Sequence, residues 1–384
     1  MEQRALTDEE RLDWLQLIRS DNVGPVTFHA LIAKFGTAAH ALEALPGLTR
    51  NAAGKRAVRL APRAVAEREL AALRKYGARL IAACEPDYPQ PLAALPDAPP
   101  LLAVHGRPEL LRGICVGMVG ARNASTNGRR FATKLAMDLG AAGLTIVSGL
   151  ARGLDTAAHE GSLATGTVAV IAGGVDVVYP PENAKLMARI AEEGAVVAEQ
   201  PFGLKPTARH FPYRNRVISG LSRAVVVVEA TLKSGSLITA RLAAEQGRDV
   251  LAVPGSPLDP RAAGTNGLIR DGATLITCAA DVIAALGPLD SPFEQNQRVT
   301  TPSRIDVSAF AQAPQEVEAE LDGASGLQDK ILELLGFSPT TIDELTRRAQ
   351  VSPATLASAI LELELAGRIE RQPGGQISLI ISML

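Results

Sequence analysis

Glycines, hydroxyl side chains and arginines follow or precede several short apolar runs in the middle of this chain. The run 224–228, AVVVV, comes after the segment Arg-Asn-Arg at 214–216 and before a Ser-Gly-Ser turn at 234–236. Arginine can bind a phosphate through two hydrogen bonds, and glycine lets a ligand approach the backbone closely. Residue types in this pattern indicate a site for a phosphate-bearing ligand.

A parallel β-sheet would bring these residues together. Apolar runs alternate with amphipathic helical stretches between residues 79 and 276, and this pattern predicts an α/β domain with an extended Rossmann-like, doubly wound and mostly parallel sheet. The predicted strands are 79–82, 101–104, 114–119, 145–147, 167–171, 195–198, 224–228, 250–253 and 274–276. In such a sheet the carboxyl ends of the strands share one edge, where ligands bind. We call this edge the rim.

Five turns with glycines or small hydroxyls are predicted to lie along the rim. Four arginines and a lysine accompany them, which exceeds what ion pairing with Asp176, Glu199 and Glu229 would need. These cations are Arg122, which follows Gly120, and Arg152, Lys185, Arg214 and Arg216. Four aromatic residues could offer faces on which unpaired bases stack, although packing in the core is the default for each of them. They are Tyr179, Phe202, Phe211 and Tyr213.

Common nucleotide-binding and catalytic motifs are missing. The chain contains no GxxxxGK[ST], and the first rim turn reads GARNASTNG, which departs from GxGxxG. Ser148, Asp155 and His159 could be grouped as a catalytic triad. However, Asp155 and His159 lie one helical turn apart, so we expect Asp155 to cap its helix and His159 to lie on a helix face. No catalytic residue is predicted.

Composition limits the class of protein. The net charge is −2 and the aromatic content is 3%, so any polyanion site must be a local patch. Cys84, Cys115 and Cys278 are scattered, which predicts neither disulfides nor a metal site and favours a reducing compartment. No apolar run is long enough for a membrane helix, and the first residues do not resemble a signal peptide. We therefore expect a cytoplasmic protein without a cofactor.

Four regions follow from the change in pattern along the 384 residues. Residues 1–76 predict a small helical domain of the SAM or helix-hairpin-helix type, and 77–286 form the Rossmann-like core. The composition of 287–326 is typical of a linker. Residues 327–384 predict a winged-helix domain of three helices and a hairpin closed by Pro-Gly-Gly. This last region carries more acidic than basic residues, so we expect it to contact protein rather than DNA.

Several motifs resemble those of one family, DNA processing protein A (DprA, also called Smf). The matching stretches occur in the family's order through roughly residues 110–280. They include VGARNASTNG, VSGLARGLDTAAHEGSL, AVIAGGVDVVYPPEN, HFPYRNRVISGLSRAVVVVEA and SGSLITARLAAEQGRDVLAVPGS. The flanking regions are similar to those of its longer members.

This resemblance implies a protein that binds single-stranded DNA and loads the RecA recombinase onto it, in natural transformation or recombination. It also implies a homodimer formed through the core. By motif, Arg122 and Lys185 would hold DNA phosphates, while Arg214, Asn215 and Arg216 would frame the rim. Ser148, Gly149, Ser234, Gly235 and Ser236 would line the groove.

The alternative is an enzyme that processes nucleotides, such as a phosphoribohydrolase built on a similar core. As the resemblance between the cores suggests, those enzymes use a PGGxGTxxE loop whose glutamate acts on the N-glycosidic bond. The corresponding turn here reads SGSLITAR, without a glutamate at that spacing. This difference favours the binding protein over the enzyme.

Overall fold

Four helices form the N-terminal part of the computed structural model, which describes residues 3–48, 59–288, 331–332, 335, 340–349, 351–372 and 376–379. The helices are α1 (Asp8–Ile18), α2 (Pro25–Phe35), α3 (Ala38–Leu48) and α4 (Arg63–Tyr76). Thr7 and Glu10 form the capping box that the sequence predicts at the start of α1. Helix α2 begins after Gly24 and ends at Gly36, whose φ of 78° lies in the region that glycine tolerates.

A nine-stranded sheet forms the core, and all nine predicted strands are present within two residues of their expected ends. Its order is β1-β2-β6-β5-β4-β3-β7-β8-β9. The strands are β1 (Arg79–Ala82), β2 (Leu101–Gly106), β3 (Cys115–Val119), β4 (Thr145–Ser148), β5 (Thr167–Ile171), β6 (Ala195–Ala198), β7 (Ala224–Val227), β8 (Asp249–Ala252) and β9 (Thr274–Leu275). Strands β3 to β9 pair in parallel, whereas β2 pairs antiparallel with both β1 and β6. The doubly wound, mostly parallel prediction is confirmed.

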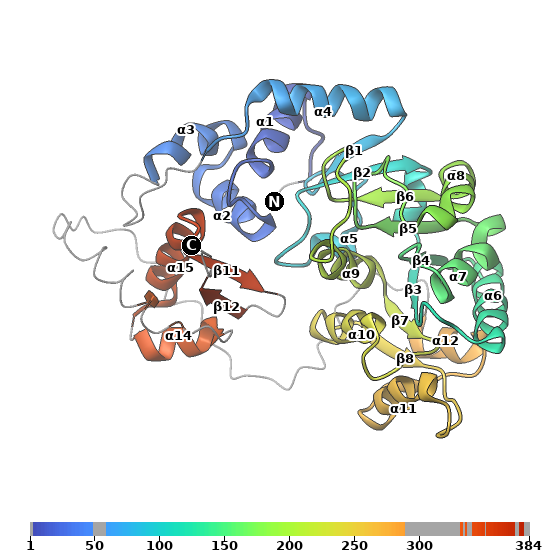
Figure 1. Ribbon diagram of the computed structural model, residues 1–384. Coiled ribbons are helices and arrows are strands. Elements are labelled where there is room, and N and C mark those ends of the chain that lie inside the picture. The colour runs from blue at the N-terminus through green and yellow to red at the C-terminus, as the bar shows by residue number, and fades with distance from the viewer. Residues whose placement is uncertain are drawn as a thin grey trace.

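Helices cover both faces of this sheet (Figure 1). Strand β7 shows the division, because Ala224 and Val226 pack with α6 and α7 while Val225 and Val227 pack with α9 and α10. Continuous apolar runs such as this one are what a strand buried on both faces requires. The helices of the core are α5 (Gln90–Ala93), α6 (Thr126–Ala141), α7 (Leu154–Ser162), α8 (Ala184–Glu193), α9 (His210–Leu221), α10 (Gly235–Glu245), α11 (Ala263–Arg270) and α12 (Ala279–Leu286).

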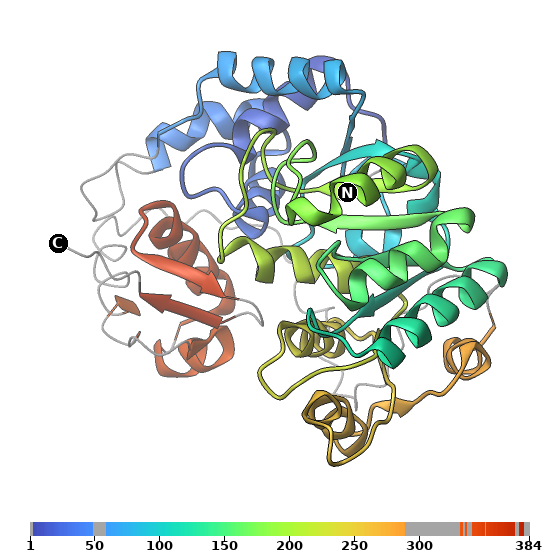
Figure 2. The same ribbon diagram turned by 45° about the vertical axis from the view of Figure 1, so that its right-hand side comes forward.

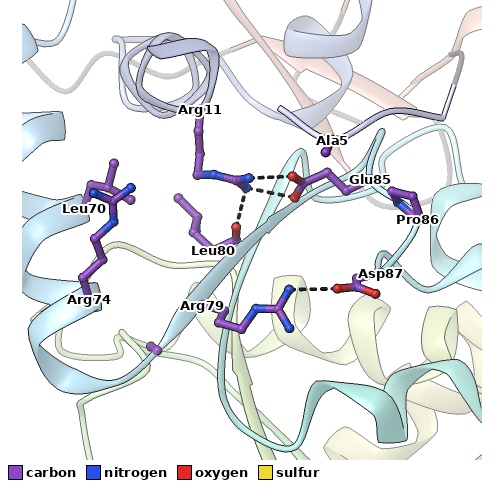
Figure 3. A pocket seen from close by; sticks show the side chains of 10 residues that line it. Ala5, Arg11, Leu70, Arg74, Arg79, Leu80, Glu85, Pro86 and Asp87 are labelled. Atoms are coloured by element: carbon purple, nitrogen blue, oxygen red, sulfur yellow. Dashed lines mark hydrogen bonds and ion pairs between the residues drawn. The ribbon is translucent and has the colours of Figure 1, made fainter. Parts of the chain in front are cut away.

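The N-terminal helices dock on the end of the sheet that contains β1. The Arg11 guanidinium donates to both carboxylate oxygens of Glu85, at 2.5 and 2.9 Å, and to the carbonyl oxygen of Leu80 at 2.6 Å (Figure 3). Arg79 pairs with Asp87 at 2.8 Å in the same pocket. Since Arg11 and Arg79 are both paired with carboxylates, this pocket is poorly suited to a polyanion.

The C-terminal residues form a three-stranded sheet with two helices, beside the N-terminal helices (Figure 2). The elements are β10 (Thr340–Thr341), α14 (Ile342–Ala349), α15 (Pro353–Leu365), β11 (Ile369–Gln372) and β12 (Gln376–Leu379), with strand order β10-β12-β11. Helix α15 buries Leu361 and Leu365 in the same apolar cluster as Phe28 of α2. Most of the predicted linker and most of the first predicted helix of this domain lie outside the described residues, as does the whole Pro-Gly-Gly turn.

Candidate nucleic-acid interface

Two buried side chains of α7 accept hydrogen bonds from the backbone of the turn after β4. An Asp155 carboxylate oxygen accepts the N–H groups of Gly149 and Ala151, both at 3.2 Å. His159 Nε2 accepts the N–H of Leu150 at 3.3 Å. These N–H groups therefore point into the protein and are not donors for a phosphate. We call this turn the platform, and an anion at this part of the rim cannot use the N–H groups of residues 149–151.

His159 is a neutral, structural residue. Its Nδ1 lies 2.9 Å from Thr167 Oγ1, which donates to the carbonyl oxygen of Ile146. Nδ1 therefore carries the proton, and Nε2 is the acceptor for Leu150. Burial, reinforced by the nearby Arg214, lowers the pKa of His159 to about 3. Burial raises the pKa of Asp155.

Arg214 reaches the platform from α9. Its guanidinium donates to the carbonyl oxygens of Gly149 and, at 2.9 Å, Val170. A Cβ atom at Gly149 would overlap this guanidinium, so glycine is required there for a close approach. Arg214 is 7% exposed, and its Nε atom has no hydrogen-bond partner among the described residues. Its positive charge is thus held just beneath the surface of the rim.

An aromatic pair and a second arginine lie above Arg214. The guanidinium carbons of Arg122 and Arg214 lie 5.4 and 5.9 Å from the centre of the Phe211 ring, respectively. Tyr179 lies 5.6 Å from Phe211, centre to centre, and its side chain is 44% exposed. Stacking faces and cations in contact are the combination that binds unpaired bases and their phosphates.

These groups line one pocket at the carboxyl ends of β3, β4 and β5. Its walls also include Ala172 and Pro180. Arg152 completes the pocket, and its guanidinium is 3.5 Å from Glu182 with both side chains more than half exposed. An exposed pair at this distance is weak, so Arg152 can exchange Glu182 for a phosphate at little cost.

The usual cofactor position of a Rossmann fold is filled by the protein itself. The chain order reverses between β3 and β7, and a dinucleotide would place its phosphates there, at the N-terminus of α6. The carboxylate of Glu229 occupies this N-terminus, where it accepts the N–H of Ser125 at 2.9 Å. A Cβ atom at Gly120 would overlap Leu154, so this glycine allows close packing instead of ligand approach. The open pocket lies next to this reversal of the chain order, at the carboxyl end of β4.

The structure brings Arg122, Gly149, Arg152 and Arg214 together around this pocket, and it places the other predicted residues elsewhere. Ser148 is fully buried, and its hydroxyl donates to the carbonyl oxygen of Met118 at 2.6 Å, so it does not line the groove. Lys185 is exposed in the first turn of α8, outside the pocket lining. The turn Ser234, Gly235 and Ser236 follows β7, also outside it, and its two hydroxyls lie 2.8 Å apart.

The expectation that Arg216 frames the rim is wrong. Arg216 is 4% exposed, and its guanidinium binds the Glu199 carboxylate and the carbonyl oxygen of Asp97, both at 2.5 Å. Asn215 is also buried, at 9% exposure. Of the Arg-Asn-Arg segment, only Arg214 reaches the pocket.

Two features of the pocket had weak signals in the sequence. Tyr179 and Phe211 were among four possible stacking residues, and nothing in the sequence separated them from Phe202, which packs on Tyr76 with ring centres 5.6 Å apart. Pro180 follows Tyr179 through a cis peptide bond.

Within the part of the chain that the structure describes, no cluster of three potential metal ligands occurs. Ser148, His159 and Asp155 do not form a triad, because each is bonded to backbone or to Thr167. No described helix is both long and apolar enough to span a membrane. What the pocket offers is cations and ring faces, without a nucleophile in position.

Fold and pocket together define a class: a Rossmann-like protein whose dinucleotide position is closed and whose rim carries arginines beside aromatic rings. Family models give the particular assignment. Residues 79–287 match the model described as DNA recombination-mediator protein A, residues 8–72 match the DprA-like N-terminal HHH domain, and residues 312–375 match the DprA winged helix domain. The chain belongs to the DprA family.

Individual relatives agree with this assignment. Protein Smf of Synechocystis sp. is 36% identical over 311 residues, which cover 76% of this chain and 77% of that protein. DNA processing protein DprA of Streptococcus pneumoniae is 46% identical over 199 residues, which cover 51% and 70% respectively. A crystal structure of DprA from S. pneumoniae superimposes with a TM-score of 0.56 over 73% of this chain and 93% of that one, at 36% identity.

Proposed function

We propose that this protein binds single-stranded DNA at the rim, without cutting it, and acts as a mediator of recombination. The observation that carries this proposal is the stack of Arg122 over Phe211, with Arg214 below and Tyr179 beside it. Duplex DNA hides its base faces, whereas a single strand offers both bases for stacking and phosphates for the arginines. Binding of this kind requires no hydrogen bonds to the edges of the bases.

A salt series with single-stranded and double-stranded oligonucleotides tests this proposal. The logarithm of the binding constant for the single strand should fall linearly with the logarithm of the salt concentration. The expected slope is about −0.7 for each phosphate neutralised. Arg122→Ala should weaken binding for all sequences alike and make that slope shallower. Arg189→Ala is a matched control, because Arg189 is an exposed arginine of α8 that pairs with Glu193. An unchanged slope for Arg122→Ala would remove Arg122 from the site.

The alternative function, a nucleotide-processing enzyme, requires Glu229 to act on a substrate. Glu229 instead accepts hydrogen bonds from Ser125, and its carboxylate fills the space beside Gly128. These contacts support the non-catalytic proposal. Base release from nucleoside monophosphates by the wild type, abolished in Glu229→Gln, would favour the enzyme.

We further propose that the protein loads RecA onto the bound strand, in natural transformation or in other recombination. Membership of the DprA family supports this step. It would be measured as the rate of RecA assembly on single strands, with and without the protein. Free, buried Cys84 and Cys115 suit the reducing cytoplasm, where we place this activity.

We propose a domain organisation of four regions, 1–76, 77–286, 287–326 and 327–384. We also propose that the core forms a homodimer. Leu232 and Leu258 support the dimer, because they follow β7 and β8 and are 73% and 94% exposed. Apolar side chains this exposed at one end of a sheet are suited to burial against a second copy.

A further inference from the structure

We propose that the bound strand continues from the rim into a second contact surface, the groove between α6 and α7, where Arg129 and Arg130 bind its phosphates. This inference rests on the proposed function, since it extends the path of the same strand. The groove is a separate hollow from the rim pocket, and the two share no lining residue.

Helical spacing creates the groove. Arg129, Thr133 and Met137 lie four residues apart on one stripe of α6, and Thr156 and Glu160 lie on the facing stripe of α7. The two helices pack against each other through small residues, because a Cβ atom at Gly161 would overlap the backbone of Thr133. From Arg129 to Met137 the groove is about 12 Å long, at 1.5 Å per helical residue. That length suits a few nucleotides.

The groove opens directly from the rim. Gly153, which begins its lining on α7, is bonded to Arg152 of the rim pocket. The Thr156 hydroxyl donates to the carbonyl oxygen of Ala151, another residue of that pocket, at 2.9 Å. A Cβ atom at Gly153 would meet the carbonyl oxygens of Ala121 and Arg122, so the first turn of α7 is held against the turn that carries Arg122. The rim pocket and the groove therefore adjoin at the first turn of α7, so one strand can contact both.

Charge distinguishes this groove from the pocket of Figure 3, which also contains several arginines. Arg129 and Arg130 are exposed, and neither side chain has a hydrogen-bond or ion-pair partner among the described residues. Lys134 pairs with Asp138 at 2.8 Å, and Glu160 is the one carboxylate among the residues that line the groove. In the pocket of Figure 3, by contrast, Arg11 and Arg79 are already paired with carboxylates. Two free guanidinium groups next to an anion-binding rim favour a polyanion as the occupant.

Oligonucleotide length provides the test. A dinucleotide spans about 7 Å, at roughly 3.4 Å per nucleotide, and can occupy only the rim pocket, while an oligonucleotide of about twenty nucleotides also reaches the groove. Arg129→Ala/Arg130→Ala should weaken binding of the longer strand roughly tenfold and make its salt slope shallower by about 1.4, the value for two phosphates lost. Binding of the short strand should not change. Arg189→Ala should alter neither.

Failure of this inference and failure of the proposed function give different results. Arg122→Ala should weaken both strands, and if it weakens neither, the rim itself is not the site. If Arg122→Ala weakens both and Arg129→Ala/Arg130→Ala weakens neither, only the groove is excluded. Equal losses for both lengths in the double variant also overturn the inference, because they indicate a general effect of charge. Unchanged binding of the long strand with slower RecA assembly would instead assign the groove to a protein partner.

Discussion

Gly149 and Arg214 show how two residues far apart in sequence produce one feature of the site. Arg214 can lie beneath the surface only because Gly149 has no side chain and its carbonyl oxygen accepts from the guanidinium. We expect Gly149→Ala to displace the guanidinium and to weaken binding of single-stranded DNA at low salt. Gly267→Ala is the control, because Gly267 lies on α11, outside the lining of the rim pocket, and a Cβ atom there meets no described atom within 4 Å. Equal affinity of Gly149→Ala and the wild type would mean that the position of Arg214 does not matter for binding.

His159 gives the platform a pH dependence. Its pKa of about 3 in the folded protein lies below the ordinary value of 6.5. Between these values the unfolded chain binds more protons, so the stability contributed by His159 is complete above about pH 6.5 and falls as pH drops below it. The loss is at most roughly 1.4 kcal/mol per pH unit.

Urea unfolding at pH 8 and pH 5 measures this effect. His159→Gln keeps an acceptor and a donor but cannot be protonated, so it should lose less stability between the two pH values than the wild type does. Asp155 is present in both proteins and its own titration cancels in the comparison. His40→Gln, a change at an exposed histidine, should behave like the wild type. If all three proteins lose the same stability, protonation of His159 is not the cause.

Sequence reasoning identified the residue types of the site but not which members of a cluster reach it. Arg214 and Arg216 are two positions apart on α9, and side chains with that spacing point to opposite sides of a helix. Arg214 therefore faces β4 and β5, while Arg216 faces Asp97 and Glu199. The Arg-Asn-Arg motif alone could not show this, because the carboxylates that pair with Arg216 are distant in sequence.

At the scale of elements, the central strands β3 to β7 were predictable because each is a short run of residues buried on both faces. The partner of α15 was not predictable. Helix α15 would be the recognition helix of a DNA-binding winged helix, yet Leu361 and Leu365 are buried against the N-terminal helices. Asn22 also donates to the carbonyl oxygen of Leu365 at 2.8 Å. Such a contact depends on packing between residues more than 300 positions apart, for which the sequence has no local signal.

This docking leads to an expectation for the winged-helix domain. Helix α15 packs its apolar side against the N-terminal helices. The region 327–384 also contains more acidic than basic residues. We expect deletion of 327–384 to leave the affinity for single-stranded DNA within about twofold, because phosphate contacts dominate that affinity. Circular dichroism and thermal unfolding would establish that the shortened protein is folded. A large loss of affinity in a folded, shortened protein would assign DNA binding to this domain.

At the scale of the whole molecule, the two ends of the sheet differ in how they are covered. The N-terminal helices cover the end with β1 (Figure 1). At the other end β9 is an edge strand of two residues. Leu275 of β9 is 47% exposed, and Leu232 and Leu258 lie in the turns after β7 and β8. Edge strands and exposed apolar residues are normally protected from uncontrolled association. A second copy of the chain placed on this end would provide that protection and leave both flanking domains free.

Replacing these leucines therefore tests the proposed homodimer. Leu232→Asp/Leu258→Asp should shift the protein from dimer to monomer in sedimentation experiments at micromolar concentration, because burying two carboxylates in an apolar interface is strongly unfavourable. Val65→Asp is the control, since Val65 is a 38% exposed apolar residue on α4, in the N-terminal part. A dimer unaffected by the leucine changes would place the interface elsewhere. In the monomer each rim pocket remains intact, so short oligonucleotides should bind as before, whereas long ones should lose the added affinity of two linked sites.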